Sequence, residues 1–419
     1  MFERLDRTYL AVFREYPPLL NLAVITLAGQ LAFGLLNFYA LPVYLVQDLG
    51  VSGLALGAAS TTFLAIEMVL KLPMGRLSDR VGRKPLIMLG PLLVCLNPTI
   101  IVSLPARVWA LVFPLRAVDG AGAAALWPPL YAMVGDLVRD RSRATAMAVV
   151  HTVYIAALGL AAVVGSLSAY LTRSDRFPFY LASGLLVLSG LVAHFGLPQT
   201  RGYAGEPHTE ISPLGGPMEP EPAPPPAAAR AAPYPVALIL LMGLLMTMGP
   251  LMLSNFLILY AKVELGMTTL HIGVLLAIFG APMVLLGLPL GRLSDRWGKA
   301  RAVRFAVVVS AIMMWLMPFP RTVVTFALVG APLVLSQILG MPAWLGLVSQ
   351  LAPTSRRGGI MGLVATAEGI GAAAAPLLGG VLWDISPPYI FFGSAAVLTL
   401  AAVVALFTLR REPPGMSAG

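Results

Sequence analysis

Six ionisable side chains interrupt long apolar stretches of this sequence, and they are the residues best suited to carry chemistry. A charged group is costly to place among apolar residues, so it is read by default as functional, with a partner. A carboxylate shielded from water also takes up and releases a proton more readily near neutral pH than one in water. The chemistry that these residues suggest is reversible protonation. The six are Glu67, Lys71, Arg116, Asp119, His151 and Glu368.

Two of the carboxylates are candidate proton carriers. Glu368 has no charged partner within its own apolar stretch, which favours a functional role. Glu67 precedes Lys71 by four residues, a spacing that brings both side chains to one face of a helix. Two interpretations of Glu67 stay open: a proton carrier, or one partner of a salt bridge that fixes the helix.

Arg116 and Asp119 form a candidate switch for proton coupling. They lie three residues apart, so they too share a helix face, and the arginine favours the ionised carboxylate until substrate or a conformational change separates the two. The alternative is a permanent structural pair. His151 is a further candidate for proton transfer, with a hydrogen bond at a helix interface as the alternative.

The stretches that hold these residues are long enough to cross a lipid bilayer. Hydrophobic residues make up 58% of the 419 and charged residues 11%, whereas a soluble domain has about a quarter of its residues charged. Lipid-exposed backbone must be hydrogen-bonded internally, and no alternating barrel pattern is present, so each crossing of about 20 residues is expected to be a helix. We predict an all-α membrane protein with twelve transmembrane helices. The expected spans are 20–46, 53–74, 86–105, 108–137, 143–171, 177–198, 235–262, 268–290, 303–319, 322–351, 357–383 and 388–409.

The basic residues indicate which side of the membrane each loop faces. With the N-terminus inside, 21 of the 28 Lys and Arg fall in inner segments, five in outer segments and two within spans. Because cytoplasmic loops collect Lys and Arg, we expect both termini in the cytoplasm and a location in the inner (plasma) membrane of the cell. The net charge of +9 therefore reports topology, and no nucleic-acid partner is expected.

The chain divides into two halves around a proline-rich segment. Residues 199–234 contain EPEPAPPPAAARAAP, typical of an extended cytoplasmic linker. Six spans fall in 1–198 and six in 235–419. The segment PMGRLSDRVGRK at 73–84 recurs as PLGRLSDRWGKA at 289–300, each time after the second span of its half. This repeat predicts two pseudo-symmetric six-helix bundles with a binding site between them.

The repeated segments resemble the loop signature G-x-x-x-D-R-x-G-R-[KR] of the major facilitator superfamily. In that family the signature lies between helices 2 and 3 and again between helices 8 and 9. The first copy here is complete, whereas the second has Lys299 and Ala300 where a basic pair is usual. The segment RAVDGAGAA at 116–124 resembles R-x-x-Q-G-x-G-A-A of the drug:proton antiporter branch, with Asp119 in place of Gln.

A third resemblance lies in helix 11 instead of its usual place. Gly371, Pro376 and the pair Gly379–Gly380 resemble the G-x-x-x-G-P-x-x-G-G pattern that antiporters of this superfamily carry in helix 5. Helix 5 of this chain has neither the proline nor the paired glycine. The simple interpretation of the helix 11 motif is tight helix packing with a kink.

The resemblance implies a latch at the cytoplasmic side. Asp79 would meet the N-terminal end of helix 11 near Arg356 and Arg357, and Arg83 would bridge to Asp136. This latch would close the cytoplasmic side when the transporter faces outward. The alternative is that the basic residues are membrane-edge anchors.

The glycines of the latch are expected to permit a tight turn and close helix contact. The second copy has Gln350 or a neighbour in place of Asp136, so we expect its latch to be weaker or structural. The candidate latch residues are Gly75, Asp79, Arg80, Gly82, Arg83, Asp136, Asp295 and Arg296.

The resemblance also implies that helices 1, 4, 7 and 10 line a central cavity. Amide and aromatic side chains on these helices, with Met and Phe around them, suit an amphipathic ligand. The candidate lining residues are Gln30, Asn37, Tyr39, Trp127, Tyr131, Asn255, Tyr260, Gln337 and Trp344.

We expect a secondary transporter that works by alternating access and exports lipophilic or amphipathic small molecules in exchange for protons. The alternatives are a proton-coupled importer (symporter) of a metabolite and a non-transporting membrane sensor. Enzyme motifs such as G-x-S-x-G, H-E-x-x-H and the phosphate-binding loop do not occur, and one cysteine, Cys95, excludes a disulfide framework and a multi-cysteine metal site. We expect no catalytic residue, cofactor or metal. The expected partners are a small-molecule substrate, protons and membrane lipid, and the expected state is a monomer.

Overall fold

The computed structural model describes residues 13–138, 140–198, 236–351 and 357–409, and within these ranges the regular structure is helical, without a strand. A helix lies at every predicted span, with ends within a few residues of those expected except that α4 and α12 run about seven residues further. Long uncharged stretches and lipid-compatible backbone pairing account for this agreement. In the first half the helices are α2 (Pro18–Leu35), α3 (Leu41–Val43), α4 (Gly53–Val81), α5 (Arg83–Val94), α6 (Asn97–Ser103), α7 (Val112–Leu137), α8 (Asp140–Thr172) and α9 (Phe177–Gly196).

The second half repeats this plan. The expected linker at 199–234 lies outside the described residues. The helices that follow it are α10 (Val236–Ser254), α11 (Leu257–Val263), α12 (Thr269–Trp297), α13 (Lys299–Leu316), α14 (Val323–Leu351), α15 (Arg357–Ile385) and α16 (Tyr389–Thr408).

Ten helical spans in the described residues are long and apolar enough to cross a membrane. Three pairs of consecutive helices merge into such spans, α2 with α3, α5 with α6 and α10 with α11. The two predicted spans that do not qualify correspond to α12, whose apolar part is the shorter Thr269–Gly280, and to α13, whose first six residues include three basic ones. The protein is a multi-pass, all-α membrane protein, and the number twelve stays a prediction.

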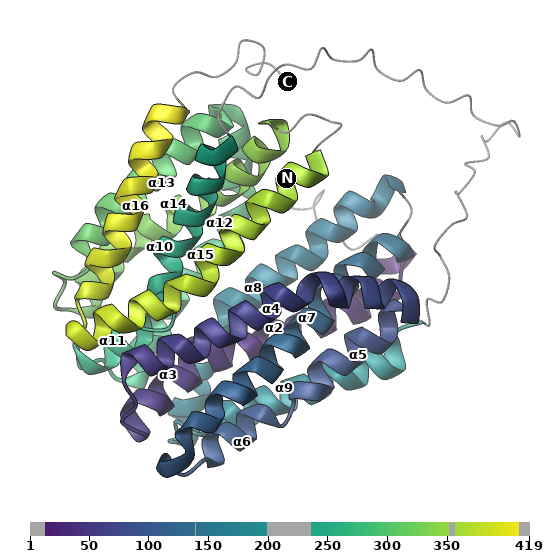
Figure 1. The fold of residues 1–419 in the computed structure, drawn as a ribbon, viewed down its shortest axis with the longest axis horizontal. Helices are drawn as coiled ribbons and strands as arrows, with labels where there is room; N and C mark the ends of the chain where they lie inside the picture. The colour runs from purple at the N-terminus through teal and green to yellow at the C-terminus, as the bar shows by residue number, and fades with distance from the viewer. Residues whose placement is uncertain (1–12, 139, 199–235, 352–356, 410–419) are drawn as a thin grey trace, which may run out of the picture.

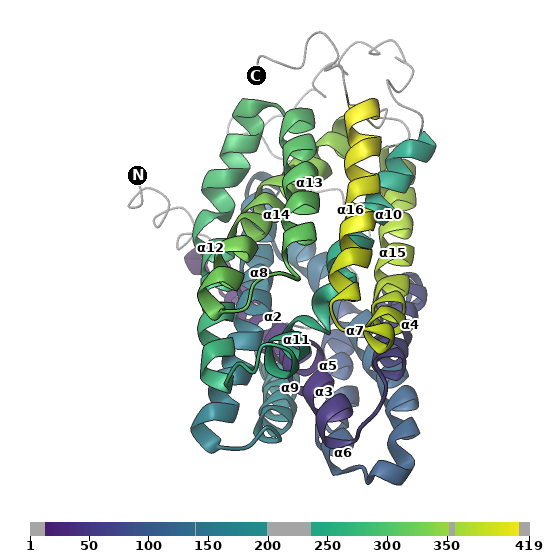
Figure 2. The same ribbon diagram turned by 90° about the vertical axis from the view of Figure 1, so that its left-hand side faces the viewer.

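The helices form two bundles that meet along two seams (Figure 1). Within the first half α2 packs on α8 and α9, and α4 packs on α7; within the second half α10 packs on α15 and α16, and α13 packs on α14. One seam joins α4 to α15 and the other joins α8 to α12. Figure 2 shows the helices of both bundles running between the same two ends of the molecule.

We name the two ends by their residues. The basic end holds the turns at Gly82, Val138 and Gly298, and the opposite end holds the connections at 49–52, 104–105, 173–176, 264–268 and 386–388. One continuous hydrophobic core includes the first bundle and the part of the second bundle around Phe256, Phe326 and Phe391.

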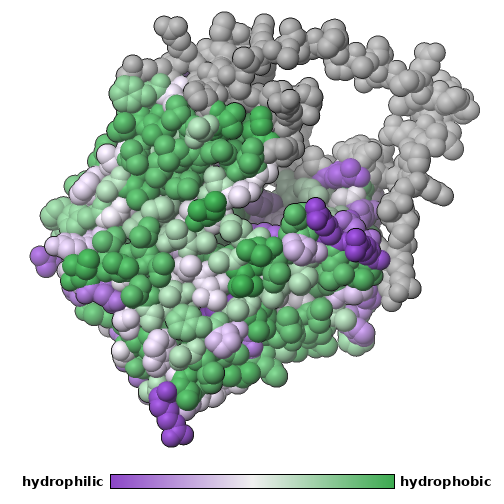
Figure 3. All heavy atoms as spheres, in the orientation of Figure 1, coloured by the Kyte–Doolittle hydropathy of each residue, from purple (hydrophilic) through white to green (hydrophobic). Residues whose placement is uncertain are grey.

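The rest of the second bundle has a separate core that includes Met242, Val303 and Ala402. The halves therefore share a core toward the opposite end, while Figure 3 shows a recess between them toward the basic end.

Candidate functional site

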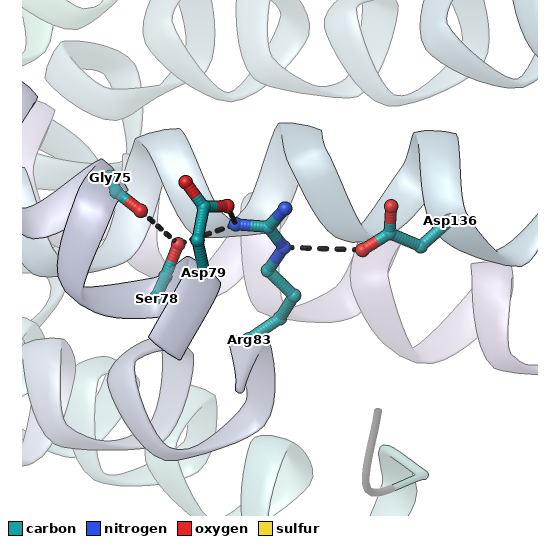
Figure 4. A network of polar contacts seen from close by, with 5 residues as sticks. All are labelled: Gly75, Ser78, Asp79, Arg83 and Asp136. Carbon is teal, nitrogen blue, oxygen red and sulfur yellow. Dashed lines mark hydrogen bonds and ion pairs between the residues drawn. The ribbon is translucent and has the colours of Figure 1, made fainter. Parts of the chain in front are cut away.

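The spacing of charges in the first basic loop places Arg83 between two carboxylates (Figure 4). Its guanidinium donates through Nε to Asp136 Oδ2 at 3.1 Å, and through Nη1 to Asp79 and, at 2.6 Å, to Ser78 Oγ. Ser78 is buried and donates in turn to the Gly75 carbonyl at 2.7 Å. One arginine thus ties the end of α4 and the start of α5 to the end of α7. Sequence reasoning missed Ser78, since a small hydroxyl carries no charge signal.

The two glycines of this loop differ in what they do. Gly82 has φ +98°, a conformation that favours glycine, so it supplies the expected tight turn between α4 and α5. The expected close helix contact at Gly75 is not found within the described part of the chain, where a Cβ added at Gly75 would meet no heavy atom within 4 Å. Gly75 contributes its carbonyl group instead.

The second copy reproduces the turn of the first. Gly298 has φ +94°, and Ser294 is buried like its counterpart Ser78. Arg296, like Arg80, is exposed. The side chains of Asp295 and Arg357, and residue Arg356 as a whole, lie outside the described residues, so the expected partner of Asp79 on helix 11 does too.

A buried polar network joins three helices in the interior of the first bundle. Arg116 and Asp119 are 0% and 1% exposed, and Arg116 Nη1 lies 2.8 Å from Asp119 Oδ2. Asn97, at the start of α6, donates to the other carboxylate oxygen at 2.8 Å. Arg116 Nη2 donates to Asn37, whose own amide donates to the Phe33 carbonyl at 2.7 Å. The predicted pair is thus fixed from both sides by amides that sequence spacing did not connect to it.

Two further features shape the surroundings of Arg116. Asn37 lies in a π-helical turn, Leu36–Ala40, that follows α2, and such turns are frequent at functional sites. The guanidinium carbon lies 4.4 Å from the centre of the Phe63 ring, a cation–π contact with α4. Buried Nε of Arg116 has no hydrogen-bond partner among the described residues.

Glu67 and Lys71 form an ion pair on α4, with Nζ 2.9 Å from the carboxylate, as in one of the two interpretations left open for Glu67. Their side chains are 13% and 53% exposed, so the carboxylate points inward and the ammonium group outward. Glu67 also interacts electrostatically with Arg116 and with Tyr154 of α8. The candidate proton carrier on α4 therefore faces the buried network and α8.

A row of aromatic rings extends from α4 to α8. The Phe63 ring centre lies 6.1 Å from that of Phe33, the Phe33 ring centre lies 6.3 Å from that of Trp127, and Trp127 meets Tyr154 edge-on at 5.1 Å. His151 stacks on Tyr154 with ring centres 6.0 Å apart and is exposed. This row gives the first bundle an aromatic wall with a titratable imidazole at its end.

Glu368 lies in the middle of α15 and meets a residue that the sequence placed in the cavity. Trp344 of α14 donates its indole N–H to Glu368 Oε1 at 2.7 Å. A Cβ added at Gly243 of α10 would come within 3.5 Å of both side chains, so the pair is packed on α10 at a glycine. The structure thus joins the candidate proton carrier of the second half to a candidate lining residue.

The remaining candidate lining residues divide by their contacts. Gln30 and Asn255 are buried, Asn255 at the break between α10 and α11. Gln337 donates to Ser310 of α13 at 3.1 Å, which directs its amide into the second bundle and away from the first. Tyr131 is half-buried near the end of α7.

Two of the three tyrosines suggested for the cavity, Tyr39 and Tyr260, lie toward the opposite end. Tyr39 donates to Asp175 at 3.2 Å, and Tyr260 packs edge-on against Phe391 at 4.7 Å. Both are buried in the core that the two halves share. Each of these two contacts lies within the tyrosine's own half.

Comparison with known proteins agrees with this architecture. The sequence model of the Major Facilitator Superfamily matches residues 22–337 and 239–418. Multidrug resistance protein 1 of Bacillus subtilis (strain 168) is 23% identical over 386 residues, 89% of this chain and 92% of that protein. Multidrug resistance protein 2 of the same organism is 24% identical over 357 residues, 83% of this chain and 85% of that protein.

A solved structure shows the same fold. A mutant of the nucleoside transporter NupG aligns with a TM-score of 0.74 over 93% of this chain and 99% of that chain, at 14% sequence identity. Two bundles, a repeated basic turn and a family match across nearly the whole sequence lead to one conclusion: the chain belongs to the Major Facilitator Superfamily, a family of membrane transporters and not of enzymes.

Proposed function

We propose that this transporter exports lipophilic or amphipathic small molecules in exchange for protons, by alternating access. The observation that carries the proton coupling is the environment of Glu368. Its carboxylate lies within a membrane-spanning helix, packed on α10 at Gly243, and the partner that the structure gives it is the neutral indole of Trp344. An ionisable group placed in this way is a functional-site hypothesis by default.

The contacts of Glu368 suit a group that changes protonation during the cycle. Removing water from a carboxylate favours its neutral form, whereas the Trp344 hydrogen bond favours the ionised form. A rearrangement of α14 against α15 alters both influences. Proton uptake and release are thereby linked to the relative positions of these helices.

The Arg116–Asp119 pair is better suited to a structural joint than to a proton carrier. Both carboxylate oxygens accept hydrogen bonds, one from Arg116 and one from Asn97, and Asn37 holds the guanidinium. A switch would have to break these bonds in a buried site, which is costly. We propose that the pair fixes the first, third and fourth spans as one unit, while Glu67 and His151 remain candidates for proton transfer in that half.

The basic loop is proposed to act as a latch through Arg83. The guanidinium holds α4, α5 and α7 together (Figure 4) at the basic end, where Figure 3 shows the recess between the halves. Asp79 is largely exposed, so it is accessible for a contact with helix 11 when the halves close at this end. In the present arrangement its partner is Arg83.

The direction and the substrate class are supported by the relatives. Two proteins that match more than four fifths of this chain are named multidrug resistance proteins. Phe63, Phe33 and Trp127 of the aromatic row are buried, so the rings that an amphipathic ligand can reach are those of half-buried Tyr154 and exposed His151.

Reconstituted vesicles with an imposed pH gradient test the proposal. We expect movement of a fluorescent lipophilic cation against its gradient, coupled to proton flow and abolished by a proton ionophore. Glu368→Gln, which keeps the shape but cannot titrate, is expected to reduce coupled transport at least tenfold. The matched control is Glu264→Gln, at an exposed carboxylate near the opposite end.

Two results would contradict the proposal. Full activity of Glu368→Gln would remove the coupling role from this residue. Movement of the dye in the same direction as the protons would indicate a symporter. A nucleoside transporter with the same fold is compatible with that alternative.

A further inference from the structure

The seam between α4 and α15 is built from backbone contacts at regular spacing. A Cβ added at Gly57 would lie 2.2 Å from the Pro376 carbonyl oxygen, and one added at Gly380 would lie 2.3 Å from the Gly53 carbonyl oxygen. Deeper in the membrane, Thr61 Oγ1 donates to the Ala373 carbonyl at 2.7 Å. Steps of about four residues on both helices keep these contacts on one face, and the helices run antiparallel. The glycine and proline motif of helix 11 therefore lies against the first half.

The motif ends one turn before Asp384, and this carboxylate completes the first turn of α4. A helix begins with N–H groups that have no partner within the helix. In α4 Ser52 accepts from Ala55 N at 3.2 Å, within its own half. Asp384, from the other half, accepts from Gly53 N at 2.6 Å through Oδ1 and from Leu54 N at 2.9 Å through Oδ2.

This contact is favourable for two physical reasons. Each carboxylate oxygen takes one backbone N–H, in charge-assisted hydrogen bonds, which are stronger than neutral ones. The negative charge also lies at the positive end of the helix dipole. Trp383 packs beside the contact: it lies against Gly53 and stacks on Phe256 with ring centres 5.5 Å apart.

Both halves contribute to the contact at this end, but in different ways. Across the second seam Lys262 donates to Asp175 at 2.7 Å, and Ser166 donates to the Thr269 carbonyl. The Lys262–Asp175 contact joins two side chains that are partly exposed, so each partner can be hydrated when it opens. Asp384 is exposed as well, and what distinguishes its contact is that two backbone donors of a helix start lose their acceptor together when the halves part.

We propose that Asp384 is the positioning residue that holds the opposite end of the transporter closed, by capping α4 across the interface between the two halves. Opening this end requires the carboxylate to leave the N-terminus of α4. The cap therefore sets the balance between the two access states and limits the rate at which the opposite end opens. The inference rests on the alternating-access part of the proposed function and not on its coupling ion or cargo.

The distance between two spin labels at the opposite end tests this inference. The labels are placed at Arg107 and Arg321, both exposed and on different halves, in a Cys95→Ser background. Purified protein in lipid nanodiscs is expected to give a predominant short distance. Asp384→Asn, which replaces one acceptor oxygen by a donor amide, is expected to raise the ratio of open to closed molecules about tenfold. Asp384→Glu, which keeps the charge, is expected to cause a smaller shift.

Asp48→Asn is the matched control, since Asp48 is an exposed carboxylate at the same end. It is expected to leave the distance distribution unchanged. A second label pair at Val81 and Trp297, both exposed at the basic end, reports the other side and shows that each variant is folded. With Asp384→Asn the basic-end distance should shorten as the opposite-end distance lengthens.

The outcomes separate the two hypotheses. If the unmodified protein changes its distances at both ends on adding a transported dye, but Asp384→Asn leaves the populations unchanged, the cap has no role and alternating access stands. If neither pair of labels ever changes distance in the unmodified protein, alternating access itself fails. If Asp48→Asn and Asp384→Asn shift the distance distributions equally, the effect is due to the loss of a surface charge, and the inference is overturned.

Discussion

At the scale of single residues, burial decides what an ionisable side chain can do. Arg116 and Asp119 are fully enclosed and are hydrogen-bonded to each other and to two asparagines, with Arg116 Nε left without a partner among the described residues. Glu368 is only half-buried, and its described partner is an indole. A buried pair held by several hydrogen bonds resists a change of charge, whereas a carboxylate with no countercharge among the described residues responds to a change in its surroundings. The two sites therefore have different expected roles although both were identified by the same sequence criterion.

Removing one member of the buried pair is expected to destabilise the protein strongly. Arg116→Ala leaves the Asp119 carboxylate buried without a countercharge, which costs about 3 kcal/mol or more. We expect a clear fall in melting temperature of the purified protein. Asp119→Asn removes the negative charge that compensates Arg116 and is expected to be destabilising as well.

The control for this comparison is Arg107→Ala. Arg107 is exposed at the opposite end, so its loss should change stability by no more than about 0.5 kcal/mol. Equal melting temperatures for Arg116→Ala and Arg107→Ala would exclude the structural joint.

At the scale of elements, helix ends determine where the two bundles can be joined and moved. The turn at Gly82 separates α4 from α5 within one residue, and Gly298 does the same between α12 and α13. The start of α4 is completed by Asp384 of the other bundle. The same helix is thus tied to its own half at the basic end and to the other half at the opposite end.

Two glycines of the same loop should respond in opposite ways to alanine. Gly82→Ala places a side chain at φ +98° and is expected to cost about 1–3 kcal/mol. Gly75→Ala meets open space in a helix, where alanine is favoured over glycine by about 0.5–1 kcal/mol. Thermal unfolding of both variants measures the difference. A loss of stability at Gly75 as large as that at Gly82 would contradict this account of the turn.

At the scale of the whole molecule, the distribution of charge and the packing of the core define two unlike ends. The basic end carries the repeated loops, and its second-half core is separate from that of the first half. At the opposite end one core runs through both halves. A bilayer places the basic end in the cytoplasm if the positive-inside rule applies.

Labelling of single cysteines in intact cells tests this orientation. In a Cys95→Ser background we expect Arg107→Cys to react with a membrane-impermeant maleimide added outside, and Val81→Cys to react only after the membrane is permeabilised. Both side chains are exposed, so accessibility within the protein is matched. Reaction at Val81 from outside would reverse the topology.

The sequence alone determined the helices and the repeat, because these depend on local composition. A bilayer requires about twenty apolar residues per crossing, and each segment's own sequence shows whether it meets that requirement. The pairs Glu67–Lys71 and Arg116–Asp119 could also be predicted from the sequence, since helix geometry brings residues three or four apart together.

Only the tertiary structure decided which distant residues meet. Trp344 and Glu368, Asn97 and Asp119, and Gly53 and Asp384 are joined by the packing of whole helices, and no local spacing predicts those contacts. The structure also showed that a Cβ at Gly75 would meet no heavy atom of the described residues within 4 Å and that Gly82 makes the turn. Local composition determines which segments enter the membrane. The packing of helices that are far apart in the chain determines which ionisable side chains are fixed by partners and which are able to change their protonation.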